Sequence, residues 1–193
     1  MEMVMPTNFN LIQEMKINSA LKNRRIYLSN EVDRETVFEV IYFLDRLRDI
    51  DFKKGTKEDI EIVIDSYGGH IYHGLSLISK QQQMIDEGYR IITTVSGVAM
   101  SMGYCVSVVA SKRRGYRHST YLLHQPSSGT WGTLKQMEDD IEETNRLWEK
   151  MKNIVKQYTK ITEEELETMK REKRDWIFSA EEALKYGIID EIL

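Results

Sequence analysis

Residues 60–69 read IEIVIDSYGG, and residues 89–103 read YRIITTVSGVAMSMG. Each stretch begins as a β-branched apolar run and ends in glycine and small residues, which is typical of a buried strand that turns into a helix. Apolar residues at helical spacing follow the first stretch, so a helix is expected over residues 71–86. After the second stretch, Gly97 is expected to end the strand and a buried helix to cover residues 99–110.

The same alternation extends toward the N-terminus. Residues 25–28 (RIYL) predict a short strand, and residues 30–49 carry apolar side chains at helical spacing. Strands that alternate with helices in this way indicate an α/β fold with a parallel sheet and right-handed crossovers. Residues 1–24 show weak periodicity, and we interpret them as an extended or partly helical arm that precedes the domain.

The second half of the chain is richer in charge and in helix signals. One or two short strands are expected over residues 115–123, and a long charged helix over residues 133–158. That helix is long enough to project from the domain. Thr162 and Ser179 each begin a capping-box pattern, which predicts two further helices before a final strand at residues 188–193.

Composition excludes several classes of protein. The 193 residues, 41% hydrophobic and 30% charged, suit one globular domain. A formal net charge of −4 provides no basic field for a nucleic-acid backbone. The longest uncharged stretch, residues 91–111, fits a buried strand and helix better than a membrane span. A single cysteine, Cys105, and an N-terminus without a basic and apolar leader favour the cytoplasm.

Two strand-to-helix turns carry groups suited to binding an anion. Ser101 lies between an apolar strand and an apolar helix, where unsatisfied backbone N–H groups favour a tetrahedral oxyanion. Gly68 and Gly69 follow the neighbouring strand and expose further N–H groups at the same edge of the sheet. From the local pattern alone, a helix-capping serine and an ordinary glycine turn are the commoner interpretations.

His124 and Asp175 complete a candidate catalytic group. His124 is expected at a strand end, where it suits a general base, and Asp175 stands beside Trp176, whose ring is expected to shield it from water. A triad needs its nucleophile, base and acid on converging loops, in any order along the chain. Taken singly, such a histidine is more often a surface or core residue, and such an aspartate a solvated one.

Two further histidines raise the question of a metal. His70 and His73 lie three residues apart on one expected helix face. Without cysteine or acidic ligands at suitable spacing, this pair is a weak signal. No metal site is expected.

Several motifs in the same order make the chain resemble the ClpP family of Clp-type caseinolytic serine peptidases. The likeness covers residues 25–193, and His124 follows Ser101 by 23 positions and Asp175 follows His124 by 51, close to the family pattern. The motifs are Asp65-Ser66-Tyr67-Gly68-Gly69, similar to the family's Asn-Ser-Pro-Gly-Gly; Gly97-Val98-Ala99-Met100-Ser101-Met102-Gly103, similar to Gly-Gln-Ala-Ala-Ser-Met-Gly; Leu123-His124-Gln125-Pro126; Arg174-Asp175 before a Phe-Ser-Ala-Glu-Glu-Ala run; and Tyr186-Gly187-Ile188-Ile189-Asp190. Together they outweigh the single-residue alternatives.

The resemblance implies a role for each residue in peptide hydrolysis through an acyl-enzyme. Ser101 is the nucleophile, His124 the base and Asp175 the acid that orients it. The backbone amides of Gly69 and Met102 form the oxyanion hole. No metal and no cofactor are implied. The implied contacts to the polypeptide substrate are Gly68, Gln125, Pro126, Gly129 and Trp131.

The resemblance also implies a fold and an assembly. The fold is a crotonase-like spiral of β-β-α units over residues 25–193, with a projecting handle at about residues 125–158. The assembly consists of heptameric rings of the same chain, two of them stacked through the handles around a closed chamber. Some of the apolar side chains along the handle are expected to face another subunit; they are Trp131, Leu134, Met137, Trp148 and Met151.

The chain departs from the family at three places. Tyr67 replaces a proline before the glycine pair, so a rigid φ angle is lost in the loop that positions the Gly69 amide. Near Glu61 and Val63 the family commonly carries aromatic residues that help to form a pocket for an ATP-driven unfoldase, and here those aromatic residues are missing. The N-terminal arm matches no axial-pore loop of the family. An AAA+ unfoldase is a candidate partner, but these departures argue against a dedicated one.

The function expected from the sequence is the ATP-independent peptidase core of a self-compartmentalising serine endopeptidase. One alternative is a phage-type protease that processes a specific partner such as a capsid or scaffold protein. Another is a non-catalytic ring subunit. A crotonase-type acyl-CoA enzyme shares the implied fold, but it would not need Ser101, His124 and Asp175 together.

Overall fold

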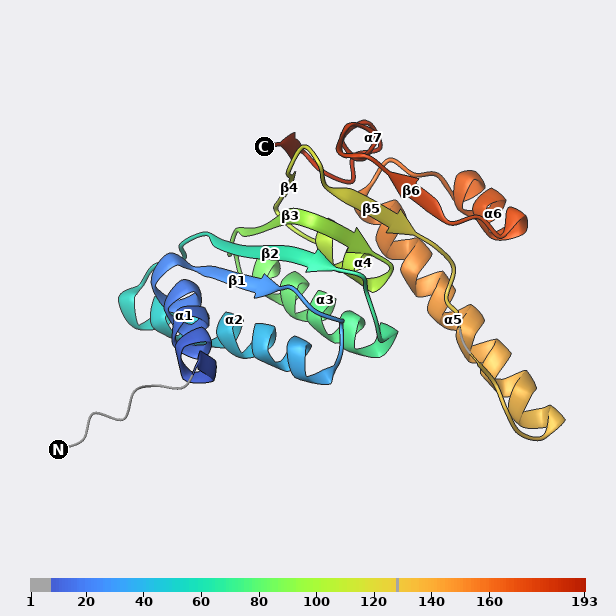
Figure 1. Ribbon diagram of the computed structural model, residues 1–193, viewed down its shortest axis with the longest axis horizontal. Helices are drawn as coiled ribbons and strands as arrows, with labels where there is room; N and C mark the ends of the chain where they lie inside the picture. Colours follow the sequence, from blue (N-terminus) through green and yellow to red (C-terminus); the bar gives the residue numbers. More distant parts are fainter. Residues whose placement is uncertain (1–7, 128) are drawn as a thin grey trace.

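The computed structural model describes residues 8–127 and 129–193 as a mixed α/β fold (Figure 1). In chain order the elements are α1 (Asn8–Asn23), β1 (Arg25–Leu28), α2 (Arg34–Lys54), β2 (Ile60–Ser66), α3 (Ile71–Asp86), β3 (Ile91–Met100), α4 (Met102–Val108), β4 (Lys112–Gly115), β5 (Thr120–Leu123), α5 (Leu134–Tyr158), α6 (Glu163–Glu172), β6 (Trp176–Phe178), α7 (Ala180–Lys185) and β7 (Glu191–Ile192).

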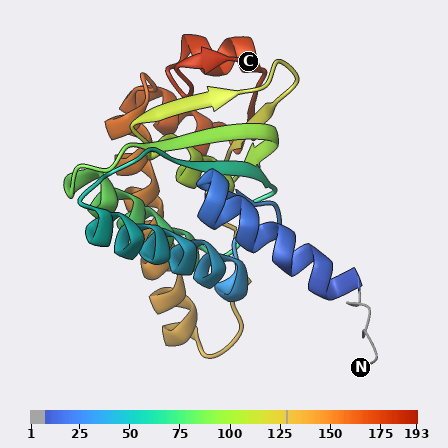
Figure 2. The same cartoon turned by 90° about the vertical axis from the view of Figure 1, so that its left-hand side faces the viewer.

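The strands form one mostly parallel sheet, as the alternation predicts. The order is β1-β2-β3-β4-β7, and β5 branches off to pair with β3 and β6. All of these pairs are parallel except β5 with β6. Helices α2, α3 and α4 lie together on one side of the sheet (Figures 1 and 2). The predicted α/β class is therefore confirmed.

Strand β2 shows why these residues form the centre of the sheet. The side chains of Ile60, Ile62 and Ile64 are fully buried, and the residues between them are less so. This alternation places one face of the strand in the core, against α4. In α3, which packs on α4 and β3, Leu77 and Met84 are fully buried. They are seven residues apart, about two turns, and so lie on the same face of the helix.

The expectation that Gly97 ends β3 is wrong. The strand continues to Met100 because it changes partner: β2 accompanies it up to Ala99, and β5 pairs with it from Val98 onward. Gly97 has a steric role instead. A β-carbon at this position would lie 2.5 Å from the Asp65 carboxylate, which accepts a hydrogen bond from the Val98 N–H at 3.0 Å. The buried helix α4 is correspondingly shorter than predicted.

Helix α5 confirms the predicted long helix and projects from the rest of the molecule (Figure 1). Thr133 caps its N-terminus in a capping box with Gln136. One expectation about its apolar residues is corrected: Trp148 and Met151 are buried within this chain, 2% and 1% exposed, because the C-terminal half of α5 packs on α4 and α6. Leu134 and Ile141, in the projecting half, are 75% and 58% exposed.

Helix α1 lies at the other end of the molecule. It packs on β1 and α2, and its N-terminal end points away from the sheet (Figure 2). Residues 1–7 of the expected arm lie outside the described residues. No helix in the described part of the chain is long and apolar enough to cross a membrane.

Candidate active site

Ser101 occupies a strained turn between β3 and α4. Its backbone angles are φ 54° and ψ −121°, a conformation that a residue with a β-carbon rarely adopts. The Ser101 N–H donates to the Leu122 carbonyl at 2.9 Å, which ties the turn to β5. Ser101 stands at the N-cap position, but its hydroxyl forms no capping hydrogen bond. Capping therefore does not explain this serine, and strain of this kind is typical of functional sites.

Gly68 packs directly against this turn. Its φ is +98°, and a β-carbon there would lie 2.6 Å from both the Met100 carbonyl oxygen and the Ser101 β-carbon. Contacts this short are absent from real side chains, so only glycine allows the β2–α3 loop to approach Ser101 this closely. The close approach brings together the two turns that the sequence predicts to be neighbours.

The loop that carries Gly69 is held by hydrogen bonds, not by the proline of the family motif. The Val32 N–H donates to the Gly68 carbonyl and the His70 N–H to the Val32 carbonyl, both at 2.8 Å. The Ser66 hydroxyl donates to the Asn30 carbonyl at 2.6 Å. These bonds fix the loop against the β1–α2 connection. Tyr67, which replaces the proline, is 75% exposed and takes no part in them.

The two candidate oxyanion donors are available. Within residues 8–127 and 129–193, neither the Gly69 N–H nor the Met102 N–H donates to a protein acceptor. Met102 is the first residue of α4, so its N–H also lies at the positive end of a helix dipole. Both amides adjoin Ser101, one through Gly68 and the other directly. This arrangement can stabilise negative charge on an oxygen near the serine.

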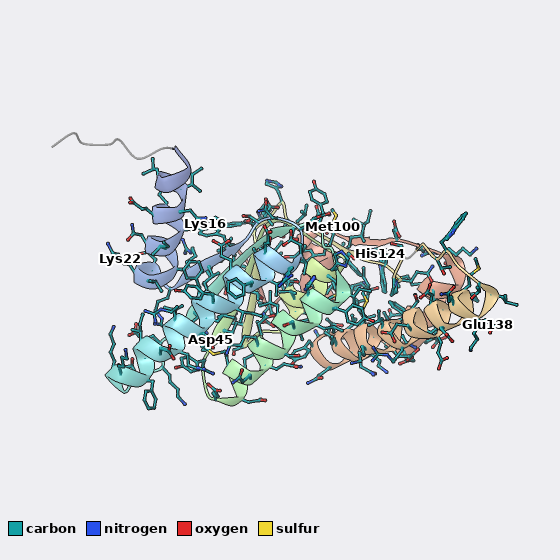
Figure 3. The ribbon with its side chains drawn as sticks, turned by 90° about the horizontal axis from the view of Figure 1, so that it is seen from below. Lys16, Lys22, Asp45, Met100, His124 and Glu138 are labelled. Carbon is teal, nitrogen blue, oxygen red and sulfur yellow. The ribbon has the colours of Figure 1, made fainter. Side chains whose placement is uncertain are left out.

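Strand β5 places His124 and Asp175 at the same edge of the sheet as Ser101. In its parallel pairing with β3, Leu122 stands opposite Met100. In its antiparallel pairing with β6, Leu123 stands opposite Trp176. One position beyond the Leu123–Trp176 pair, this register sets His124 opposite Asp175, and two positions beyond the Met100–Leu122 pair it sets His124 beside Met102, the residue after Ser101. Figure 3 shows the labelled Met100 and His124 in the same region of the molecule.

The surroundings of Asp175 differ from the expectation. Asp175 is exposed, and Trp176 does not shield it from water. The indole of Trp176 instead packs on Phe178 and Tyr186, with ring centroids 4.7 Å and 5.2 Å apart. Neighbouring residues of a strand point to opposite faces, so a ring that enters this cluster turns away from the aspartate. Among the described residues, no hydrogen bond joins the side chains of Ser101, His124 and Asp175.

Of the predicted substrate contacts, Gly68 packs against the Ser101 turn, and the other four lie along the loop after His124. Gln125 and Pro126 are half-buried, and Trp131 is 96% exposed. Gly129 has open space around its α-carbon. The structure therefore brings Gln125 and Pro126 beside the site, while Gly129 and Trp131 lie out toward the handle.

A groove that sequence reasoning missed begins at Gly69. Its volume is about 440 Å³, and it lies beside the candidate oxyanion hole. The lining comes from separate segments of the chain, so no local motif could have revealed it. Its residues are Glu31, Val32, Gly69, His70, Ile71, Tyr72, Ser127 and Leu147.

Cys105 and the pair His70 and His73 are the other reactive side chains considered near the Ser101 turn. Burial raises the pKa of the Cys105 thiol to about 12, so the thiol below Ser101 remains neutral and does not compete as a nucleophile. The rings of His70 and His73 stand edge to face with centroids 5.6 Å apart. In the part of the chain that is described, no cluster of three or more His, Cys, Asp or Glu residues could hold a metal ion.

Comparison with known proteins identifies the family. The model of the family described as Clp protease matches residues 11–193. The ATP-dependent Clp protease proteolytic subunit 1 of Prochlorococcus marinus subsp. pastoris is 32% identical over 176 residues, which cover 90% of this chain and 85% of that protein. The ATP-dependent Clp protease proteolytic subunit of Deinococcus radiodurans is 27% identical over 175 residues, 90% of this chain and 81% of the relative. The matched span contains the Ser101 turn, the glycine loop and β5, and the chain therefore belongs to the Clp protease family, a family of serine endopeptidases.

Proposed function

We propose that this chain is the peptidase core of a self-compartmentalising serine endopeptidase and that Ser101, His124 and Asp175 perform its chemistry. The observation that carries the proposal is the Ser101 turn. Ser101 is held at φ 54° between β3 and α4, and its hydroxyl forms no capping hydrogen bond. Beside it lie two backbone N–H groups that, among the described residues, donate to no protein acceptor. A strained strand-to-helix turn of this kind exposes a nucleophile at the top of a parallel sheet.

The proposed reaction follows the general logic of a serine triad. The Ser101 hydroxyl oxygen attacks the carbonyl carbon of the peptide bond while His124 takes the hydroxyl proton. The Gly69 and Met102 N–H groups bind the oxyanion that forms. His124 then protonates the leaving amine, and a water molecule hydrolyses the acyl-enzyme by the reverse sequence of proton transfers. Asp175 orients the imidazole and stabilises its positive charge.

This chemistry requires a closer contact between His124 and Asp175 than the isolated chain contains. Catalytic hydrogen bonds are often long without substrate and tighten when it binds. The register across β5 and β6 supports such a closure, because continuing it by one position past the Leu123–Trp176 pair would set the two residues opposite each other. The acid is exposed and free of ion pairs in the described structure, so no existing contact opposes the movement.

We further propose that the chain assembles into rings through the projecting part of α5. Leu134 and Ile141 are 75% and 58% exposed there, and Trp131, just before the helix, is 96% exposed, which is more apolar surface than a free helix normally presents to water. The names of the relatives describe ATP-dependent proteolysis. For this chain we propose that hydrolysis of the peptide bond itself needs no ATP, because the triad and the oxyanion hole supply all its steps.

A charged surface on the sheet favours a second, narrower function. At the position where the resemblance implies an aromatic docking residue, Glu61 pairs with Arg25 at 2.6 Å and accepts from the Thr94 hydroxyl at 2.6 Å. These contacts hold the pKa of Glu61 below its ordinary value, despite the opposing effect of burial. A charged network of this kind does not offer an apolar pocket. The charged network around Glu61 therefore favours a processing peptidase that acts on a specific partner without an unfoldase.

Replacement of the nucleophile tests the proposal. We expect Ser101→Ala to lower the rate of peptide hydrolysis by several powers of ten, because loss of the nucleophile removes the acyl-enzyme route. The matched control is Ser96→Ala, on the same strand, whose hydroxyl makes only a 3.4 Å contact with the Ile64 carbonyl. Ser101→Ala activity within about tenfold of the parent would contradict the assignment. Turnover of acyl-CoA instead of peptides would favour the crotonase alternative.

A further inference from the structure

The groove that begins at Gly69 is placed to receive one side chain of a bound peptide. It extends from Gly69 toward Ser127, which follows His124 by three residues. A peptide whose carbonyl oxygen lies at the Gly69 amide therefore passes the mouth of the groove. The volume of about 440 Å³ is enough for a long side chain.

The walls of the groove suit an extended aliphatic stem. Leu147, 7% exposed, presents apolar surface to the groove, and Val32, which is fully buried, lies behind this wall. Tyr72 forms a further wall, and its hydroxyl is already engaged because it donates to Glu143. Glu143 is in turn bonded by the Arg146 guanidinium at 2.6 Å, so this charge pair is internally neutralised.

Glu31 adds one uncompensated negative charge to the groove. Its side chain is exposed, and within the described residues it forms no hydrogen bond and no ion pair. Glu31 is the acidic side chain of the groove lining, which contains no lysine and no arginine among the described residues. No cation from this chain among the described residues occupies the position that the carboxylate addresses.

The backbone around Glu31 is held in place relative to the candidate active site. On one side, the Asn30 carbonyl accepts from the Ser66 hydroxyl at 2.6 Å. On the other, Val32 forms a parallel bridge with Gly69, and the Val32 N–H donates to the Gly68 carbonyl at 2.8 Å. Glu31 therefore stands between two residues anchored to the oxyanion loop.

We propose that this groove selects a basic side chain, lysine or arginine, next to the cleaved bond, and that Glu31 is the residue that determines this specificity. The inference rests on the proposed peptidase function of the same site. The aliphatic stem of the substrate residue lies along Leu147 and the Tyr72 ring, and its cationic head pairs with the Glu31 carboxylate. Because the carboxylate is exposed to water, we expect a preference of up to about fivefold, the typical worth of an exposed ion pair.

The experiment uses quenched fluorescent peptides that differ at a single residue. Lysine, norleucine or glutamate is placed in turn at each position flanking the cleaved bond, and kcat and KM are measured separately. The unmodified protein should prefer lysine over norleucine at one of these positions through a lower KM. Glu31→Gln should remove the preference, and Glu31→Lys should turn it toward glutamate. The control is Glu35→Gln, an exposed carboxylate in the first turn of α2 outside the groove, which should retain the lysine preference.

Binding to the Ser101→Ala variant separates this inference from the proposed function. The same labelled peptides are titrated against Ser101→Ala and Ser101→Ala/Glu31→Gln by fluorescence anisotropy. Tighter binding of the lysine peptide that depends on Glu31 supports the groove assignment even if no peptide is hydrolysed, in which case only the proposed catalysis fails. Equal binding of lysine and norleucine peptides, or a preference that Glu31→Gln leaves intact, would overturn the groove assignment while leaving the triad untouched.

Discussion

Ser101 and Gly68 form a coupled pair in which one residue is strained and the other makes room for it. The proximity of the two residues was predictable from the sequence, because small residues at two neighbouring strand ends indicate two turns at one edge of the sheet. The positive φ of Ser101 does not follow, because it arises from tertiary contacts with β5 and with Gly68. The exposure of Asp175 agrees with the commoner interpretation of such a residue as solvated, but the expected shielding by Trp176 is wrong, because the position of that ring depends on Phe178 and Tyr186.

Gly68→Ala should damage catalysis far more than stability. The added β-carbon would meet the Met100 carbonyl and Ser101 at 2.6 Å, so the nucleophile must move. A displacement of about 1 Å lowers the rate by about a hundredfold. Gly55→Ala is the matched control, because Gly55 also has a positive φ, +69°, but open space around it. Peptide hydrolysis and thermal unfolding of both variants check the prediction. Equal activity of the two variants would show that Gly68 does not support the nucleophile.

Asp175→Asn should lower kcat by about ten-thousandfold and change KM little, because the asparagine holds the imidazole in the wrong tautomer. Steady-state kinetics on one fluorescent peptide provide the measurement. Glu172→Gln, an exposed carboxylate at the end of α6, serves as the control. If Asp175→Asn retained the parent kcat, another acid would have to orient His124.

Strand β5 is the element that assembles the candidate site. The sequence predicts a short strand in this region, but its two partners, β3 and β6, are set by long-range pairing that no local pattern specifies. The same pairing explains why β3 continues through Gly97. Helix ends were more predictable, because capping is local: Thr162 and Ser179 cap the helices that their capping-box patterns indicate, and Thr133, the expected first residue of the long helix, caps α5.

Helix α6, which leads into Asp175, is fixed to α5 by a buried cation. The side chain of Lys152 is 4% exposed and contacts Glu149, Glu163 and Glu167 at 2.9, 2.8 and 2.5 Å. Hydrogen bonds from Lys152 and Lys156 lower the pKa of Glu163 from its ordinary 4.5 to about 2. A carboxylate with a lowered pKa in the folded state stabilises the fold at neutral pH, and this contribution is lost as the pH falls toward that value.

Glu163→Gln should therefore flatten the pH dependence of stability. In the parent protein, part of the free energy of unfolding disappears as the pH falls from about 5 toward about 2, and the glutamine variant should lack that part. Chemical denaturation at a series of pH values measures it. Glu164→Gln, the exposed neighbour without an ion pair among the described residues, should keep the parent profile. Identical profiles for the parent and Glu163→Gln would show that the contact with Lys152 does not persist in solution.

At the scale of the whole molecule, the α/β class and the projecting helix were predictable from alternation and from the length and charge of residues 133–158. Which apolar side chains of α5 are buried and which are exposed was not predictable from the sequence. Trp148 and Met151 lie in this chain's own core, whereas Leu134 remains exposed, because α4 and α6 reach only the C-terminal half of the helix. The surface proposed for assembly is therefore limited to the projecting half.

Charged substitutions on that half should split the assembly. We expect Leu134→Glu combined with Ile141→Glu to reduce the native mass and to lower peptidase activity together, because an exposed carboxylate cannot be buried in an apolar contact without a large desolvation cost. Native mass measurement and peptide hydrolysis are made on the same samples. Phe52→Glu, an 86% exposed apolar residue near the end of α2, is the control. A fully active monomer of the parent protein would contradict the coupling between assembly and activity.

The central claim is that Ser101 is a nucleophile activated by His124, and covalent labelling tests it most directly. The assembled protein is treated with a fluorophosphonate, whose phosphorus is attacked by an activated serine oxygen as fluoride leaves, and the adduct is located by peptide mapping. We predict an adduct on Ser101 that forms rapidly in the parent protein and far more slowly in His124→Ala. A protein that hydrolyses peptides but carries its adduct on another serine, or labelling of Ser101 at the same rate in His124→Ala, would contradict the account.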